Sequence, residues 1–361
     1  MLQKHVGVFY DSDTTRYHLS RFVNSKPLTE CTTYQTVEAL KSDHSDCKIA
    51  VLHIPYPFDP KFETQVQELL TVCEHVFVVG TEIHPEIVQF IKRTDRKNLT
   101  YYICGFINFK LEHSQVRQFM DWFETSTYFY RHWLPEILTR LNPYQSKRRS
   151  FDILLGRKKQ HRDYVYNCTK LDPYKHIVTY FDTHTTNLGD DQEQWVWEWP
   201  GMQIETKPEW TVDRVNYYGH TMSLSQIIPV NVYNNTAYSV IAETCWQDDF
   251  AFFTEKTAKP IMARRLFVVF AGRGYLDNLR KLGFRTFGDV IDESYDTETD
   301  ALVRWQLAWD QVTWLSEQPQ EEILERIRPT VEHNARVMLT TDWYDLFLSQ
   351  FEQDFARITA G

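Results

Sequence analysis

A carboxylate and an ammonium group stand side by side in the stretch FFTEKTAKP, residues 252–260. Glu255 could accept two vicinal hydroxyls of a ribose or hexose, and Lys256 is a point charge suited to a phosphate oxygen. Thr254 is placed to cap a helix that begins here, although Pro260 falls inside that helix. The stretch therefore matches the two polar parts of a nucleotide sugar. The alternative interpretation is an ordinary capped helix with a glutamate in its first turn.

A second group of cations occurs in LLGRKKQHRD, residues 154–163. A strand is expected to end near Gly156, so Arg157 and Arg162 fall at the start of the following helix. A helix N-terminus already attracts anions through its free N–H groups and its dipole, and clustered cations there oppose that dipole. A bound polyphosphate would explain them. A solvated basic turn is the alternative.

Two residues near the second expected strand could act as a general base toward an acceptor hydroxyl. His53 lies near the carboxyl end of that strand, and Asp59 lies in the loop after it. A lone histidine at a strand end is more often structural. Asp11 and Asp13 form a D-x-D pattern that holds a divalent cation in some sugar transferases, but they follow the first strand directly, so we expect no metal site.

Strand-like and helix-like segments alternate along both halves of the chain. Short β-branched or aromatic runs predict strands at 5–11, 47–55, 75–81, 99–108, 149–156, 176–181 and 265–272. Helix-compatible stretches are found at 62–74, 84–94, 114–141, 158–171, 255–263 and 274–284. Residues 227–244 are expected to hold one or two strands. This alternation predicts parallel strands with crossover helices, and ligands of such sheets bind beyond the carboxyl ends of the strands.

Composition limits the functional class. The chain has 361 residues, of which 42% are hydrophobic, enough for a folded core in two domains. The net charge of −10 disfavours a protein whose whole surface binds nucleic acid, but it leaves room for a local basic groove. Six cysteines without a C-x-x-C pair predict a cytoplasmic compartment with neither disulfides nor zinc. No long apolar run is present, so neither a signal peptide nor a membrane span is expected.

The order of motifs in the second half resembles the donor-binding half of GT-B glycosyltransferases. It is most similar to the fucosyltransferase-like group, in which a TEK box opens a helix facing the nucleotide sugar. It also resembles glycosyltransferases predicted in tailed bacteriophages, which combine LLGR…HRD with TEKT.KP and a later GF.TF…DESYD. Here the last motif reads GFRTFGDVIDESYD at 283–296, and the resemblance covers roughly residues 150–300.

The resemblance implies an α/β fold with two Rossmann-like domains that face a cleft, followed by a C-terminal helical region. The polar, basic segment 142–150 marks the expected boundary. We expect an acceptor-side domain at 1–145 and a nucleotide-sugar-binding domain at 146–310. Helices at 311–361 are expected to pack back across both domains.

By motif position, the resemblance implies that Glu255 binds donor hydroxyls and that Lys256 binds a phosphate. Arg157 would contact the diphosphate together with Arg162. Glu243, which closes a strand, would line the same donor site, and Thr254 would cap the helix there.

The resemblance also implies a base from the N-terminal domain, for which Asp11, His53 and Asp59 are the candidates. No cofactor or metal is implied. The cations would instead stabilise the departing nucleoside diphosphate.

The leading hypothesis is therefore the transfer of a sugar from a nucleotide-diphosphate sugar to an acceptor hydroxyl. The acceptor would be a glycan or a hydroxymethylated base in phage DNA, within the host cytoplasm if a phage encodes the chain. A base in duplex DNA would have to be flipped out to be reached. The alternative is a non-catalytic glycan- or nucleotide-binding protein with a degenerate GT-B fold.

Overall fold

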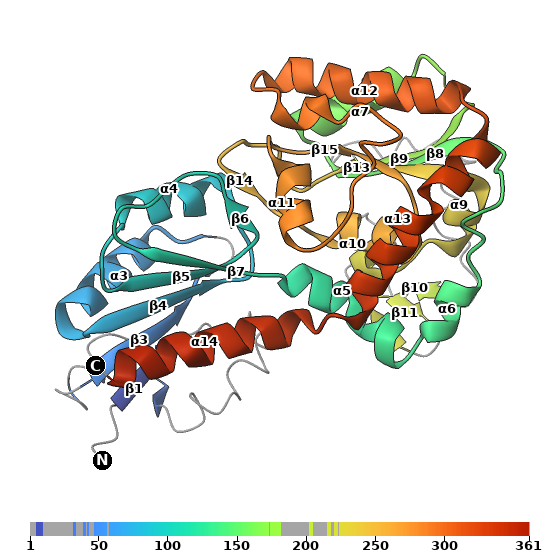
Figure 1. The fold of residues 1–361 in the computed structure, drawn as a ribbon. Coiled ribbons are helices and arrows are strands. Elements are labelled where there is room, and N and C mark those ends of the chain that lie inside the picture. The colour runs from blue at the N-terminus through green and yellow to red at the C-terminus, as the bar shows by residue number, and fades with distance from the viewer. Residues whose placement is uncertain are drawn as a thin grey trace. The chain divides into compact units, whose positions relative to one another are not determined.

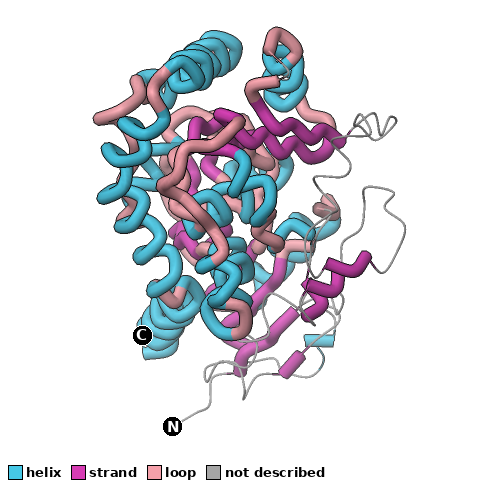
Figure 2. Tube along the Cα trace, turned by 90° about the vertical axis from the view of Figure 1, so that its right-hand side faces the viewer, coloured by secondary structure: helices cyan, strands magenta, loops and turns pink. Residues whose placement is uncertain are grey.

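The chain forms two compact units in the computed structural model. The structure describes residues 5–9, 32–33, 39–40, 42, 47–55, 58–172, 174–181, 202–204, 215–217, 220–222 and 224–360. Unit 1 comprises Met1–Glu124 and Asp342–Gly361, and unit 2 comprises Thr125–Thr341. Strands and helices alternate along the chain in both units. Figure 2 shows the helices in cyan and the strands in magenta.

Unit 1 is built on a six-stranded sheet in the order β2-β1-β3-β4-β5-β7. All of its neighbouring strands are parallel. The strands are β1 (His5–Phe9), β2 (Thr32–Thr33), β3 (Cys47–His53), β4 (His75–Gly80), β5 (Leu99–Cys104) and β7 (Gln115–Phe119). The short strand β6 (Phe106–Ile107) follows β5. The predicted parallel α/β arrangement is confirmed for this unit.

Helices cover both faces of this sheet because successive strand residues point to opposite sides. The Tyr101 ring contacts Phe90 of α4 (Pro85–Arg93) at a centroid distance of 6.0 Å. The next residue, Tyr102, contacts Phe347 of α14 (Trp343–Ala360) at 5.4 Å on the other face. Helix α3 (Lys61–Val72) joins α4 through the ring of Phe62, 5.5 Å from that of Phe90. Tyr101 and Tyr102 thus pack into the hydrophobic core on opposite faces of the sheet.

The C-terminal helix belongs to unit 1. Asp354 of α14 accepts a hydrogen bond of 2.8 Å from the Tyr102 hydroxyl and pairs with Arg117 Nε at 2.8 Å. The two preceding helices, α12 (Ala301–Glu317) and α13 (Gln320–Thr340), belong to unit 2. The bounds of the units therefore differ from the expected divisions at 145/146 and 310/311.

One expected helix contains a strand. Residues 114–141 were predicted to be helical, but 115–119 form β7, while α5 (Asp121–His132) and α6 (Pro135–Thr139) follow as helices. The strand QVRQF is the last in the sheet and four of its five residues are only partly buried. It therefore lacks the apolar run by which buried parallel strands are found. Similarly, α9 (Val230–Asn235) occupies the first part of the expected strand region 227–244.

Unit 2 is built on a four-stranded parallel sheet in the order β15-β13-β8-β9. Its strands are β8 (Arg149–Arg157), β9 (His176–Phe181), β13 (Thr236–Ala242) and β15 (Phe267–Phe270). Helices α7 (Gln160–Thr169) and α12 cover one face, and α9, α10 (Glu255–Met262) and α13 cover the other (Figure 1). The remaining elements are β10 (Met202–Ile204), β11 (Val215–Tyr217), β12 (His220–Met222), β14 (Phe250–Ala251), α11 (Tyr275–Lys281) and the 3-10 turns Leu224–Gln226 and Ser294–Thr297.

A buried ion pair fastens the strands of unit 2 together. Arg265 Nη2 lies 2.6 Å from Asp152 Oδ1, and both side chains are nearly inaccessible to solvent. Arg265 also donates to the Ser239 hydroxyl and to the backbone carbonyls of Tyr233 and Thr236. Asp152 accepts from the Ser239 and Thr236 hydroxyls. Such a pair is stable only when its other polar atoms are also bonded, as they are here.

No helix in the described part of the chain is long and apolar enough to cross a membrane.

Replacement of Asp152 by alanine should lower the free energy of unfolding by about 3–5 kcal/mol, because Arg265 would stay buried without its counter-ion. Urea denaturation measures this loss. Asp172→Ala is the matched control, since Asp172 pairs with Lys175 at 3.0 Å on the surface. An exposed pair of this kind is worth at most about 1 kcal/mol. Equal losses in the two variants would contradict the assigned role of the buried pair.

Candidate functional site

The candidate site lies at the carboxyl ends of β8 and β13, which are neighbours in the sheet of unit 2. From β8 the chain runs to β9 on one side, and it later returns to β13 and β15 on the other. Helix α7 follows β8 on one face, whereas α10 follows β13 on the opposite face (Figure 1). Ligands of open α/β sheets bind where the strand order reverses in this way.

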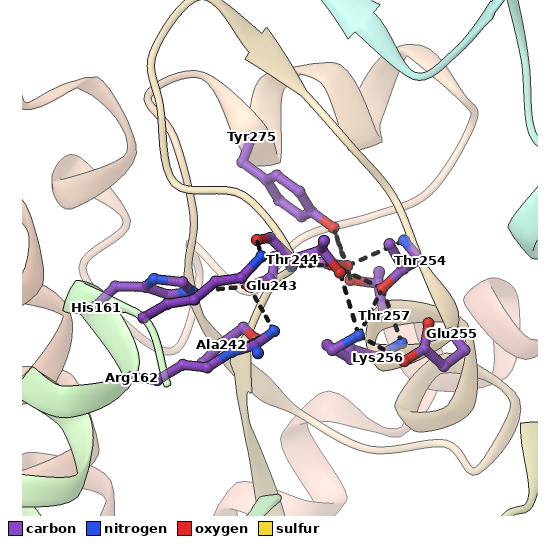
Figure 3. A network of polar contacts seen from close by, with 11 residues as sticks. His161, Arg162, Ala242, Glu243, Thr244, Thr254, Glu255, Lys256, Thr257 and Tyr275 are labelled. Atoms are coloured by element: carbon purple, nitrogen blue, oxygen red, sulfur yellow. Dashed lines mark hydrogen bonds and ion pairs between the residues drawn. The ribbon is translucent and has the colours of Figure 1, made fainter. Parts of the chain in front are cut away.

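A fully buried carboxylate, that of Glu243, follows β13 directly. Its Oε1 accepts hydrogen bonds from the Thr254 amide (3.1 Å), the Thr257 hydroxyl (2.8 Å) and the Tyr275 hydroxyl (2.9 Å). Its Oε2 accepts from the Thr244 amide (2.9 Å) and the Thr254 hydroxyl (2.8 Å). Figure 3 shows these donors around the carboxylate. Five donors satisfy a charge that would otherwise be too costly to bury.

This bonding gives Glu243 a positioning role. The carboxylate joins the end of β13 to the first turn of α10 and to Tyr275 at the start of α11. Burial, together with the Glu243 charge, raises the pKa of Tyr275 well above its usual value, so its hydroxyl stays a donor. The predicted contact of Glu243 with a donor substrate is not favoured by this burial.

The expected helix start is confirmed. The Thr254 hydroxyl accepts from the Lys256 amide at 3.3 Å, and α10 begins at Glu255. The helix runs through Pro260 and ends two residues later, at Met262. A proline has no N–H, so the carbonyl four residues earlier, that of Lys256, loses its helical donor. The short length of the helix limits the effect of the proline to its last turn.

The two side chains of the predicted donor site pair with each other. Lys256 Nζ lies 2.5 Å from Glu255 Oε1 and 3.2 Å from the Thr244 hydroxyl. The exposed fraction of the side chain is 22% for Lys256 and 9% for Glu255. Burial raises the pKa of Glu255, but the charges of Lys256 and Lys259 outweigh burial and bring the pKa below its ordinary value. Glu255 is therefore an ionised, nearly buried carboxylate that is paired with Lys256.

Three side chains at the start of α7 contact backbone carbonyls directly after β13. Figure 3 shows two of them, those of His161 and Arg162. Lys159 donates to the Thr244 carbonyl, and Arg162 Nη2 donates to the Glu243 carbonyl at 3.1 Å. His161 Nε2 lies 2.7 Å from the same Glu243 carbonyl. These carbonyls are partial negative charges, so they explain part of the cation cluster without any ligand.

The charge state of this cluster follows from its burial. Burial, with the Arg162 charge, lowers the pKa of His161 to about 3, so the ring is neutral near pH 7. A neutral ring beside a carbonyl must carry its proton on Nε2. Burial also lowers the pKa of Lys159. Arg157 ends β8, and its side chain lies outside the described residues, so its predicted phosphate contact stays a prediction.

The candidates for a catalytic base lie in unit 1. His53 ends β3 and is buried, at the point where the order of the unit 1 sheet reverses between β1 and β3. Asp59 is exposed, and its Oδ1 accepts a hydrogen bond of 2.9 Å from the amide of Lys61, the first residue of α3. Asp11 and Asp13 lie outside the described residues. Among the residues that the structure describes, no group of three or more His, Cys, Asp or Glu could hold a metal ion.

Comparisons with protein-family models, with curated proteins and with solved structures found no match for this chain.

Several residues of the network were not predicted from the sequence. Thr257 had a signal, because it lies three positions after the capping Thr254 and so falls on the same side of the helix. Tyr275 had none, because it belongs to a different helix and reaches Glu243 only in the folded unit. Lys159 and His161 were visible as part of the basic stretch, but their carbonyl partners were not.

Glu243→Gln should lower the free energy of unfolding by about 2–3 kcal/mol, because an amide NH₂ group would face hydroxyl and amide donors and leave them unsatisfied. Tyr275→Phe removes a single donor and should cost about 1 kcal/mol. Chemical denaturation gives both values, and hydrogen exchange should show faster opening of the first turn of α10 in Glu243→Gln. A loss in Glu243→Gln no larger than in Tyr275→Phe would argue against the central role of the carboxylate.

Stability should fall with acid through His161. The unfolded state takes up a proton near pH 6.5, whereas the folded state resists it down to about pH 3. Unfolding therefore becomes easier as the pH drops, and this residue accounts for about 2 kcal/mol between pH 7 and pH 5. In His161→Gln, which keeps an N–H donor, the pH-dependent loss measured by denaturation should be smaller by that amount. An unchanged loss would contradict the neutral, buried state.

Proposed function

We propose that this protein is a glycosyltransferase that moves a sugar from a nucleotide-diphosphate sugar to an acceptor hydroxyl. The observation that carries the proposal is the Glu255–Lys256 pair at the first turn of α10, beside the strand-order reversal between β8 and β13. A carboxylate for hydroxyls and an ammonium for phosphate stand at the position where α/β sheets bind such ligands.

The roles follow from the exposure of each side chain. Lys256 keeps a partly exposed ammonium that would engage a phosphate of the donor and stabilise the departing nucleoside diphosphate. Glu255 would accept hydroxyls of the ribose or of the sugar. Thr254 caps the helix and Glu243 holds it in place, so both act through the backbone they position.

The proposed binding of the acceptor by unit 1 rests on the motif resemblance and on the presence of an α/β unit other than the one that would bind the donor. In a GT-B arrangement unit 1 would recognise the acceptor, a glycan or a hydroxymethylated base in phage DNA. Asp11, His53 and Asp59 remain the candidates for the base that takes the acceptor proton. Salt-sensitive retention of duplex DNA would support the DNA acceptor, because phosphate contacts release counter-ions.

A panel of nucleotide sugars tests the proposal. At least one of them should raise the melting temperature of the protein, because a ligand of the folded state stabilises it by mass action. Lys256→Ala should weaken the binding of that compound about 10- to 100-fold, the loss expected for one charge-assisted hydrogen bond. Lys281→Ala is the matched control, because Lys281 forms an exposed pair with Asp277 at 2.9 Å on another helix. This variant should bind the nucleotide sugar with unchanged affinity.

Transfer is then assayed with the bound donor and a set of glycan and DNA acceptors, by mass spectrometry of the product. Binding that survives Lys256→Ala would reject the assigned site. No binding and no hydrolysis across the panel would reject the enzyme. Binding without transfer to any acceptor would assign the protein to the non-catalytic nucleotide- or glycan-binding class.

A further inference from the structure

Helix α10 carries a second lysine, Lys259. Lys259 is partly buried, and within the described part of the chain no hydrogen bond or ion pair engages its ammonium group. An ammonium withdrawn from water without a partner is unfavourable. The neighbouring Lys256, by contrast, is bonded to a carboxylate and a hydroxyl. Of the two lysines on this short helix, Lys256 is therefore paired with Glu255 and Lys259 is not.

The position of Lys259 points to Glu255. The two residues are four apart on one helix, with the glutamate nearer the N-terminus, which is the favourable orientation for such a pair. Each already influences the charge of the other, since Lys259 helps to lower the pKa of Glu255. The Glu255 carboxylate therefore has two lysines within reach and is bonded to one of them.

The Lys256–Glu255 pair conflicts with the binding of an anion by Lys256. Lys256 cannot give its full charge to an anion while it is bonded to Glu255, and its departure alone would leave a nearly buried carboxylate without a counter-ion. We propose that Lys259 takes over the Glu255 carboxylate when Lys256 turns to a phosphate group of a diphosphate, and thus acts as a positioning residue. The inference rests on the proposed function only for the choice of this anion.

The charges of the network suit a diphosphate. Among the described residues, the hydrogen-bond network around Glu243 together with Lys259 contains four cationic side chains and two carboxylates. The excess is two positive charges. The cations are Lys159, Arg162, Lys256 and Lys259, and the carboxylates are those of Glu243 and Glu255. This excess occurs in a chain whose net charge is −10. A ligand with about two negative charges restores the balance, whereas a neutral sugar does not.

Calorimetric titration of the full chain with inorganic pyrophosphate at pH 7 tests the exchange. Lys259→Met should weaken binding about 10-fold, and Lys259→Arg should bind within about 2-fold of the unmodified protein, because a guanidinium can also pair with Glu255. Glu255→Gln should bind pyrophosphate at least as well as the unmodified protein, because its Lys256 is already released. In the Glu255→Gln background, Lys259→Met should have no further effect.

The pH profile provides an independent readout. Burial, with the Lys256 charge, lowers the pKa of Lys259 to about 8, while Glu255 and Asp152 of the neighbouring strand β8 raise it. Lys259 is therefore charged at pH 7 and loses its charge as the pH rises through about 8. Pyrophosphate affinity should fall from pH 7 to pH 9 relative to Lys259→Arg, whose guanidinium stays charged.

The inference would be overturned by no pyrophosphate binding or by an unchanged affinity in Lys259→Met. An equal loss in the Glu255→Gln background would also overturn it, because Lys259 would then be a direct ligand. Parallel pH profiles for the lysine and arginine forms would do the same. The expected pattern without any sugar transfer would reject the proposed function alone. Sugar transfer that is indifferent to Lys259→Met would reject this inference alone.

Discussion

The buried carboxylate of Glu243 is the interaction on which the candidate site depends. A charge without access to water must be matched by donors, and its five come from β13's own extension, from the first turn of α10 and from α11. Each donor is fixed in place by this requirement. The direction of α10, and with it the location of Glu255 and Lys256, follows from the hydrogen bonds of this buried residue.

The start of α7, on the other side of the strand-order reversal, is also held by the need to satisfy buried polar groups. The backbone carbonyls of Glu243 and Thr244, directly after β13, accept hydrogen bonds from Lys159, His161 and Arg162 at the start of α7. Part of the basic stretch after β8 is therefore structural. What remains for a ligand is the partly exposed charge on α10, which lies beside this network rather than inside it.

Much of the fold could be predicted because its signals are local. Alternating apolar runs and amphipathic segments located most strands and helices of both sheets, and Thr254 correctly marked the start of α10. The strand β7 was missed because an edge strand with half-buried polar residues has no distinctive pattern. The resemblance led us to expect helices at 311–361 to pack back across both domains. Of these helices α14 belongs to unit 1, whereas α12 and α13 belong to unit 2. The division was not predicted, because the aromatic face that α14 presents to Tyr102 fits many possible surfaces.

The sequence by itself determined the α/β class, the capped helix start, and the presence of a carboxylate next to an ammonium at that start. Only the tertiary structure decided that β8 and β13 are neighbours and that both carboxylate oxygens of Glu243 accept hydrogen bonds from within the unit. It also decided that Glu255 pairs with Lys256 and not with Lys259. The physical reason is range. Helix caps and strand patterns depend on residues a few positions apart. The pairing of Thr236 with Arg149 in the sheet, and the contact of Tyr275 with Glu243, join segments that are distant in the sequence.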